Sequence, residues 1–286
     1  MDLHYLSYDF MQRSLLAGCV LAALLGLLGV LVTARGLAYL GDGLSHAAFG
    51  GITLGMFLGL TTPLYVAIPF TALAAVGIGI MRRRGGLRSD VAMATLFAVC
   101  FSAGIILLRA ARKHPTAGSP FAPESLLFGD ILLVGRDDLR IVLGVAAVTL
   151  VVVAVLWTRL AYATFDEELA RLSGIRVGWL ESVLLALLAA VVVAAIRLAG
   201  VVLVSAFLVV PSAAGRVLGK SFGGVVLWAM AIGVIGVLVG FVVAHALDWP
   251  EGATIVLVLA AFLVLAMAKA KLPFLAKRAR ARVPGR

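Results

Sequence analysis

The stretch Ile141-Val-Leu-Gly-Val-Ala-Ala-Val-Thr-Leu-Val-Val-Val-Ala-Val-Leu-Trp-Thr158 decides the fold class, because it holds no charged residue and is long enough to cross a bilayer as a helix. Similar stretches recur along the 286 residues, of which 63% are hydrophobic and 13% charged, with a mean hydropathy of +1.14. A soluble domain averages about 45–50% apolar and about 25% charged residues. The composition excludes a soluble protein, a disordered chain and a disulfide scaffold, and predicts an all-α polytopic membrane protein.

Apolar stretches of about 20 residues, separated by charged residues or Pro/Gly clusters, predict about eight to nine transmembrane helices. Only Ala199 and Gly200 separate the sixth stretch from the seventh, which leaves the count open there. We expect a single transmembrane domain over residues 1–286, with spans and loops at about 10–270 and a basic tail at 271–286. The expected spans are roughly 13–34, 37–59, 62–81, 90–109, 139–158, 180–198, 200–215, 222–246 and 253–270.

Basic residues gather at the ends of the predicted spans, so the net charge of +10 favours contact with membrane lipid and not with nucleic acid. One cluster begins at Arg82 after the third span, and another fills the C-terminal tail. The positive-inside rule places both in the cytoplasm, and an even number of predicted spans lies between them. Arg35 and the loops 159–180 and 216–221 then also fall on the cytoplasmic side.

Two titratable groups interrupt the second span, which reads Gly36-Leu-Ala-Tyr-Leu-Gly-Asp-Gly-Leu-Ser-His-Ala-Ala-Phe-Gly-Gly51. Asp42 and His46 are four residues apart and share one helix face. A carboxylate with an imidazole suits Zn²⁺, Mn²⁺ or Fe²⁺, and the pair alone does not choose among them. Two ligands form an incomplete shell, which suits a transient transport site completed by a symmetry mate or by other groups. A structural Asp–His hydrogen bond and a proton relay are the alternatives.

The predicted cytoplasmic segment Thr164-Phe-Asp-Glu-Glu-Leu-Ala-Arg-Leu-Ser-Gly174 has the pattern of a short amphipathic helix. Asp166 or Thr164 can cap its start, and Gly174 can end it. Phe165, Leu169 and Leu172 share one face, which could dock into a soluble partner or lie on the lipid surface.

The stretch Ala214-Gly-Arg-Val-Leu-Gly-Lys-Ser221 is close to a phosphate-binding loop, but Ala214 stands where that motif requires glycine. The motif also requires a preceding strand, and here a predicted membrane helix precedes it. We therefore predict no nucleotide site, no catalytic residue and no enzymatic activity in this chain. Energy from ATP would come from another subunit.

Five stretches, taken together and in this order, resemble the membrane permease subunits of ATP-binding-cassette importers for zinc, manganese and iron. The resemblance covers roughly residues 10–270. Departures at Asp130, Ser212 and Gly215 leave the metal preference open. The stretches are Ala38-Tyr-Leu-Gly-Asp-Gly-Leu-Ser-His-Ala47, Leu127-Phe-Gly-Asp-Ile-Leu132 with Asp138-Leu139, Phe165-Asp-Glu-Glu-Leu-Ala170 with Gly174, Gly200-Val-Val-Leu-Val-Ser-Ala-Phe-Leu-Val-Val-Pro-Ser-Ala-Ala214, and Asp248-Trp-Pro-Glu-Gly-Ala-Thr-Ile-Val-Leu257.

The resemblance implies a homodimeric permease of the bacterial cytoplasmic (inner) membrane, with a cytoplasmic C-terminus. Its implied partners are two ABC ATPase subunits and an extracytoplasmic metal-binding protein, and no cofactor is held permanently. Asp42 and His46 would line the path of a transported Zn, Mn or Fe ion. The coupling helix seated on the ATPase would contain Phe165, Asp166, Glu168, Leu169, Ala170 and Gly174.

Two rival functions differ in what crosses the membrane and in the source of energy. An importer of a metal chelate or siderophore would need a wider apolar path, and the Asp–His pair would then be structural. A proton-coupled secondary metal transporter would work without an ATPase, so co-purification of an ATPase through residues 164–174 would argue against it.

Overall fold

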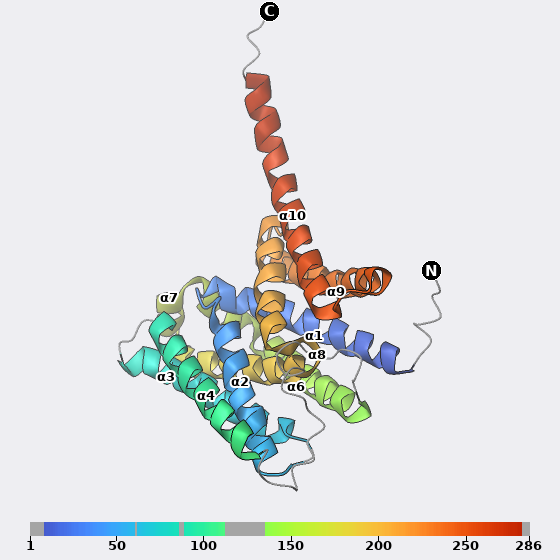
Figure 1. Ribbon diagram of the computed structural model, residues 1–286. Helices are drawn as coiled ribbons and strands as arrows, with labels where there is room; N and C mark the ends of the chain where they lie inside the picture. The colour runs from blue at the N-terminus through green and yellow to red at the C-terminus, as the bar shows by residue number, and fades with distance from the viewer. Residues whose placement is uncertain (1–8, 61, 86–88, 112–134, 282–286) are drawn as a thin grey trace, which may run out of the picture.

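The chain folds into helices throughout the part that the computed structural model describes, which is residues 9–60, 62–85, 89–111 and 135–281 (Figure 1). No strand occurs within these ranges, which confirms the predicted all-α class. The helices are α1 (Asp9–Ala34), α2 (Leu40–Phe57), α3 (Leu64–Gly85), α4 (Ser89–Ala111), α6 (Arg136–Phe165), α7 (Glu167–Leu172), α8 (Val177–Leu218), α9 (Phe222–Leu247) and α10 (Glu251–Ala281).

Within the described residues, 7 helical stretches are long and apolar enough to cross a membrane, and Leu203–Leu218 forms a shorter apolar helix. Helix α2 lies outside this set because Asp42 and His46 lower its hydropathy. With α2 added, these helices match the nine predicted stretches, with boundaries shifted by several residues. Helix α10 extends to Ala281, so the first part of the predicted tail continues the last helix.

The structure at Gly200 shows how the sixth and seventh apolar stretches are connected, which the sequence left open. Helix α8 runs from Val177 to Leu218, and its backbone departs from helical geometry at Gly200, with φ 72° and ψ 164°. Glycine reaches this positive φ without the steric cost that a side chain would add. The two stretches are therefore two arms of α8 joined by a kink.

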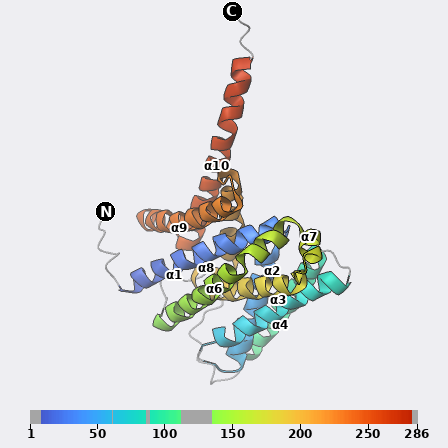
Figure 2. The same ribbon diagram turned by 180° about the vertical axis from the view of Figure 1, so that it is seen from behind.

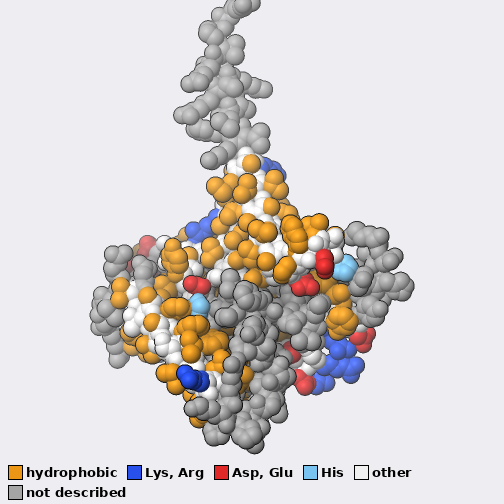
Figure 3. All heavy atoms as spheres, viewed as in Figure 1, with side chains coloured by type: hydrophobic (Ala, Val, Ile, Leu, Met, Phe, Trp, Pro, Cys, Tyr) orange, Lys and Arg blue, Asp and Glu red, His pale blue; other side chains and the backbone are white. Residues whose placement is uncertain are grey.

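Helix α1 and the first arm of α8 form the centre of the structure. In each, 67% of an 18-residue apolar segment is buried inside the protein, whereas in α4 and in α10 the buried share is 22%. Leu24, Leu28 and Leu31 of α1 are fully buried in the same core as Leu184 and Leu188 of α8. Figure 2 shows α1 between α6 and α9. Hydrophobic side chains spread over the outer face in Figure 3, as expected of helices that meet lipid.

Segments that the sequence places on one side of the membrane meet in the structure. The guanidinium of Arg35 contacts Thr164 at the end of α6. Arg82 near the end of α3 forms an ion pair with Glu181 in the first arm of α8. These four residues, Arg35, Arg82, Thr164 and Glu181, are called the arginine cluster below. Their contacts agree with the prediction that Arg35, Arg82 and the loop 159–180 lie at the same end of the bundle.

Candidate metal site

Close approaches by small residues position α2 among its neighbours. A Cβ added to Gly41 would lie 2.9 Å from a methyl carbon of Leu208 on α8, and one added to Gly50 would lie 2.7 Å from the Cys100 carbonyl oxygen on α4. The missing side chains let these helices pack tightly. Asp42 lies in the first turn of α2, where the helix dipole favours a negative charge.

The structure brings the predicted metal ligands together on one face of α2. His46 Nε2 and Asp42 Oδ1 are 3.9 Å apart, which is too far for a hydrogen bond. The direct Asp–His hydrogen bond considered as an alternative is thus not formed. Two ligands of a tetrahedral zinc ion lie about 3.4 Å apart, since each bond is about 2.1 Å long. A small side-chain rotation would bring the two atoms to that separation.

The imidazole of His46 is held by aromatic rings and lacks a polar partner at one nitrogen. The ring meets Phe97 edge-on at a centroid distance of 4.0 Å and Phe101 at 5.2 Å, both on α4. Its Nδ1 atom is buried and neither donates nor accepts a hydrogen bond with any described residue. A buried polar atom left in this state costs about 1–3 kcal/mol. No described residue offsets this cost with a hydrogen bond to Nδ1.

An open pocket adjoins the pair and is lined by Tyr39, Asp42, Gly43, Met93, Ala94 and Phe97. The Asp42 side chain is 60% exposed, whereas that of His46 is 20% exposed. Ser45 is fully buried, and its hydroxyl donates to the Gly41 carbonyl at 2.8 Å. No group of three or more His, Cys, Asp or Glu side chains that could hold a metal occurs in the described parts of the chain. One chain therefore supplies two ligands here.

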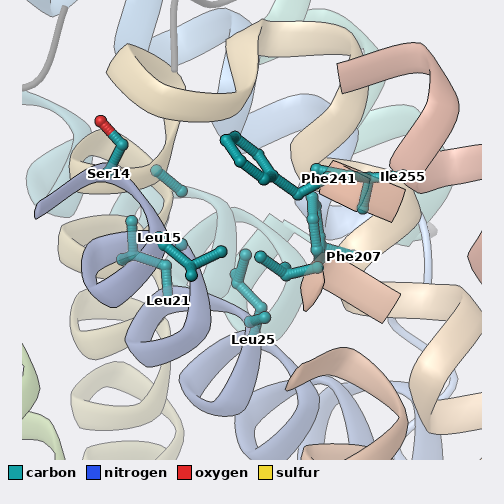
Figure 4. Close-up of a pocket in the computed structure, with 11 residues that line it drawn as sticks. Ser14, Leu15, Leu21, Leu25, Phe207, Phe241 and Ile255 are labelled. Carbon is teal, nitrogen blue, oxygen red and sulfur yellow. The ribbon is translucent and has the colours of Figure 1, made fainter. Parts of the chain in front are cut away.

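A second cavity lies between α1, α8, α9 and α10, and Figure 4 shows its lining. Leu21, Leu25, Phe207 and Phe241 dominate its wall. Its one polar side chain is Ser14, whose hydroxyl donates to the Phe10 carbonyl at 2.9 Å. This cavity offers no ligand for a metal ion.

The short helix predicted within residues 164–174 is present as α7 and begins where expected. Asp166 caps it, since its carboxylate accepts a hydrogen bond from the Leu169 amide at 2.9 Å. Gly174 follows the helix with φ 79°.

Of the side chains expected to contact a partner, most are exposed and one is not. Phe165 is 71% exposed and Leu172 is 83% exposed, and Leu169 and Glu168 are exposed with them. Ala170 is fully buried, so it holds α7 against the protein body and offers no contact to a partner.

Several relevant residues escaped the sequence analysis. Phe97 and Phe101 stand four apart on α4, a spacing that marks one helix face but not its neighbour. Glu181 is a carboxylate inside a predicted span, and a charge in that position is itself a signal of a structural or functional role.

The predicted motif around Asp130 lies outside the described residues. The stretch resembling a phosphate-binding loop starts inside α8, with no strand before it in the described chain.

Comparison with known proteins places this geometry in a family. Residues 7–270 match the model of the ABC 3 transport family. The manganese transport system membrane protein MntC of Halalkalibacterium halodurans is 31% identical over 262 residues, 91% of this chain and 87% of that protein. A probable iron transport system membrane protein of Haemophilus influenzae is 29% identical, covering 93% of this chain and 96% of that one. The structure of PsaBC from Streptococcus pneumoniae in complex with Fab has a TM-score of 0.81 and 28% identity, with 92% of each chain covered. The chain therefore belongs to the ABC 3 transport family.

Proposed function

We propose that this chain is the permease subunit of an ATP-driven importer of a divalent transition metal, with manganese as the first candidate. The observation that carries the proposal is the Asp42–His46 pair, in which His46 Nε2 lies 3.9 Å from Asp42 Oδ1 on one face of a helix in an apolar protein, and the buried His46 Nδ1 has no partner among the described residues. Relatives named for manganese and iron transport support the same substrate class. A carboxylate oxygen and an imidazole nitrogen suit these ions.

The exposure of Asp42 supports a dimer. Asp42 is 60% exposed, and the neighbouring Tyr39 is 76% exposed. A carboxylate in a membrane-spanning region does not face lipid, because its burial in hydrocarbon is costly. A second copy covering this face would remove Asp42 from lipid. It would also contribute a second Asp42 and a second His46, giving four ligands around one ion.

The proposed partners rest on the membership of the chain in the ABC 3 transport family and on the exposed face of α7. Two cytoplasmic ATPase subunits would dock on the exposed apolar face of α7, and an extracytoplasmic binding protein would deliver the ion. The chain would lie in the bacterial inner membrane with its C-terminus in the cytoplasm, as its basic clusters favour. An ion path has to release its cargo, so an incomplete shell in each chain suits transport better than a closed cage.

Uptake of Mn²⁺ into proteoliposomes containing the permease, its ATPase and its binding protein tests the proposal. The Asp42→Asn variant keeps the shape of the side chain and removes the charge, and we expect uptake to fall by roughly 100-fold, the upper range for disturbing a metal site. The matched control is Asp137→Asn, because Asp137 is an exposed aspartate in the first turn of α6. The matched control for His46→Ala is His245→Ala, because His245 is an exposed histidine.

Three results would contradict the proposal. Wild-type uptake in the Asp42→Asn variant would make the pair structural. Uptake driven by a proton gradient without ATP would favour a secondary transporter. Uptake of a ferric chelate but not of free Mn²⁺, Zn²⁺ or Fe²⁺ would favour a chelate importer.

A further inference from the structure

Arg35 ties the turn between α1 and α2 to the last turn of α6. Its Nε donates to the Thr164 hydroxyl oxygen at 3.0 Å, and its Nη2 donates to the Leu160 carbonyl at 3.2 Å. The Thr164 hydroxyl in turn donates to the same Leu160 carbonyl at 2.6 Å. The planar guanidinium therefore holds two acceptors of one helical turn in a fixed orientation. This arrangement ties the end of α6 to the turn that leads from α1 into α2.

Short pieces of chain extend from both ends of this contact. On one side, the turn after Arg35 leads into α2, whose first turn contains Asp42. On the other side, Thr164 is followed by Phe165 and then by Asp166, the residue that caps α7. The exposed Phe165 also packs against Phe222 at the start of α9, with a centroid distance of 5.1 Å. A displacement of α7 thus acts directly on the last turn of α6 at one end of α7 and on the start of α8 at the other.

Charges around Arg35 reinforce the connection. Burial lowers the pKa of Arg35, and the nearby carboxylates of Glu181 and Glu167 act in the opposite direction. Arg82 lies close enough to add repulsion, and it is itself paired with Glu181. Glu167 belongs to α7, so a movement of α7 changes the electrostatic field at Arg35 directly. The guanidinium stays charged throughout, because its pKa is far above neutral.

We propose that Arg35 is a positioning residue that transmits the movement of α7 to the Asp42–His46 pair through its contacts with Thr164 and Leu160. The proposal rests on the proposed function, in which an ATPase docks on α7. It requires a connected element that both the ATPase and the metal bias, and the Arg35 contact is one such link among the described residues.

The Mn²⁺ transported per ATP hydrolysed by the reconstituted complex tests this role. Thr164→Val removes the hydroxyl and keeps the side-chain volume, and we expect the ratio to fall about fivefold through loss of one charge-assisted hydrogen bond. Thr164→Ser restores a hydroxyl and should restore the ratio. Arg35→Gln loses both bonds and should lower the ratio by at least about tenfold. ATPase co-purification and basal hydrolysis should remain at wild-type levels in all three variants.

The controls separate failure of this role from failure of the transport function. A wild-type complex without ATP-driven metal uptake would overturn both. Wild-type uptake together with an unchanged ratio in Thr164→Val would overturn the role of Arg35 alone. An equal loss in Thr164→Ser and Thr164→Val, or a loss of ATPase co-purification, would also overturn it, because either result indicates a packing or docking role.

Discussion

The Asp42–His46 pair and the arginine cluster are two polar regions of one apolar protein, and their hydrogen bonding differs. In the arginine cluster, the guanidinium of Arg35 has two acceptors and Arg82 is paired with the buried Glu181. In the metal site, Asp42 and His46 stay 3.9 Å apart, and one imidazole nitrogen has no partner.

The difference separates polar groups that the fold pairs from the proposed metal site, where a buried nitrogen has no partner among the described residues. A buried charge is tolerated when it is paired, and removing one partner leaves the other uncompensated. A buried polar atom without a partner lowers stability, and such a cost is typical of functional sites. The two regions should therefore respond oppositely to the loss of polarity.

The largest expected change in stability follows from breaking the ion pair of the arginine cluster. Arg82→Met removes one cation beside the buried Glu181, and we expect the free energy of unfolding to fall by about 3 kcal/mol. Thermal unfolding of the detergent-solubilised protein measures the loss. The Arg82→Met/Glu181→Leu double variant should recover most of it, since both charges are then absent. A single variant as stable as wild type would contradict the distinction between the two regions.

Removing polarity from the metal site should have the opposite sign. His46→Leu deletes the partnerless nitrogen among Phe97 and Phe101, and we expect the free energy of unfolding to rise by about 1 kcal/mol while metal uptake is lost. The same unfolding experiment, performed without added metal, measures the gain. A clear loss of stability would show that His46 contributes to the fold as Arg82 does.

The smallest expected effect concerns the cap of α7, the helix on which we propose that the ATPase docks. Asp166→Ala removes the acceptor for the Leu169 amide and should cost about 1 kcal/mol of helix stability. Because α7 is short, we expect weaker ATPase co-purification, with overall unfolding nearly unchanged. Asp166→Asn keeps a capping oxygen and should behave as wild type. Equal co-purification of the Ala and Asn variants would argue against an ordered α7 as the docking element.

Features set by local spacing were predictable from the sequence. Asp42 and His46 share a face because they are four residues apart, and Asp166 caps α7 because its side chain reaches the next turn. Contacts between distant helices were not predictable. The residues next to Arg82 and His46 in the sequence do not indicate that Arg82 pairs with Glu181 or that Phe97 packs on His46. The apolar stretches on both sides of Gly200 were recognisable in the sequence, but the kink between them depends on the φ angle of Gly200, which the sequence does not specify.

Direct detection of a metal–histidine bond tests the metal site most closely. Pulsed electron paramagnetic resonance of Mn²⁺ added to the purified permease reports coupling to a directly bound ¹⁴N nucleus. We predict imidazole nitrogen coupling in the wild type and in His245→Ala, and its loss in His46→Ala. Coupling that persists in His46→Ala, or that is absent from the wild type, would contradict the assignment of Asp42 and His46 as metal ligands.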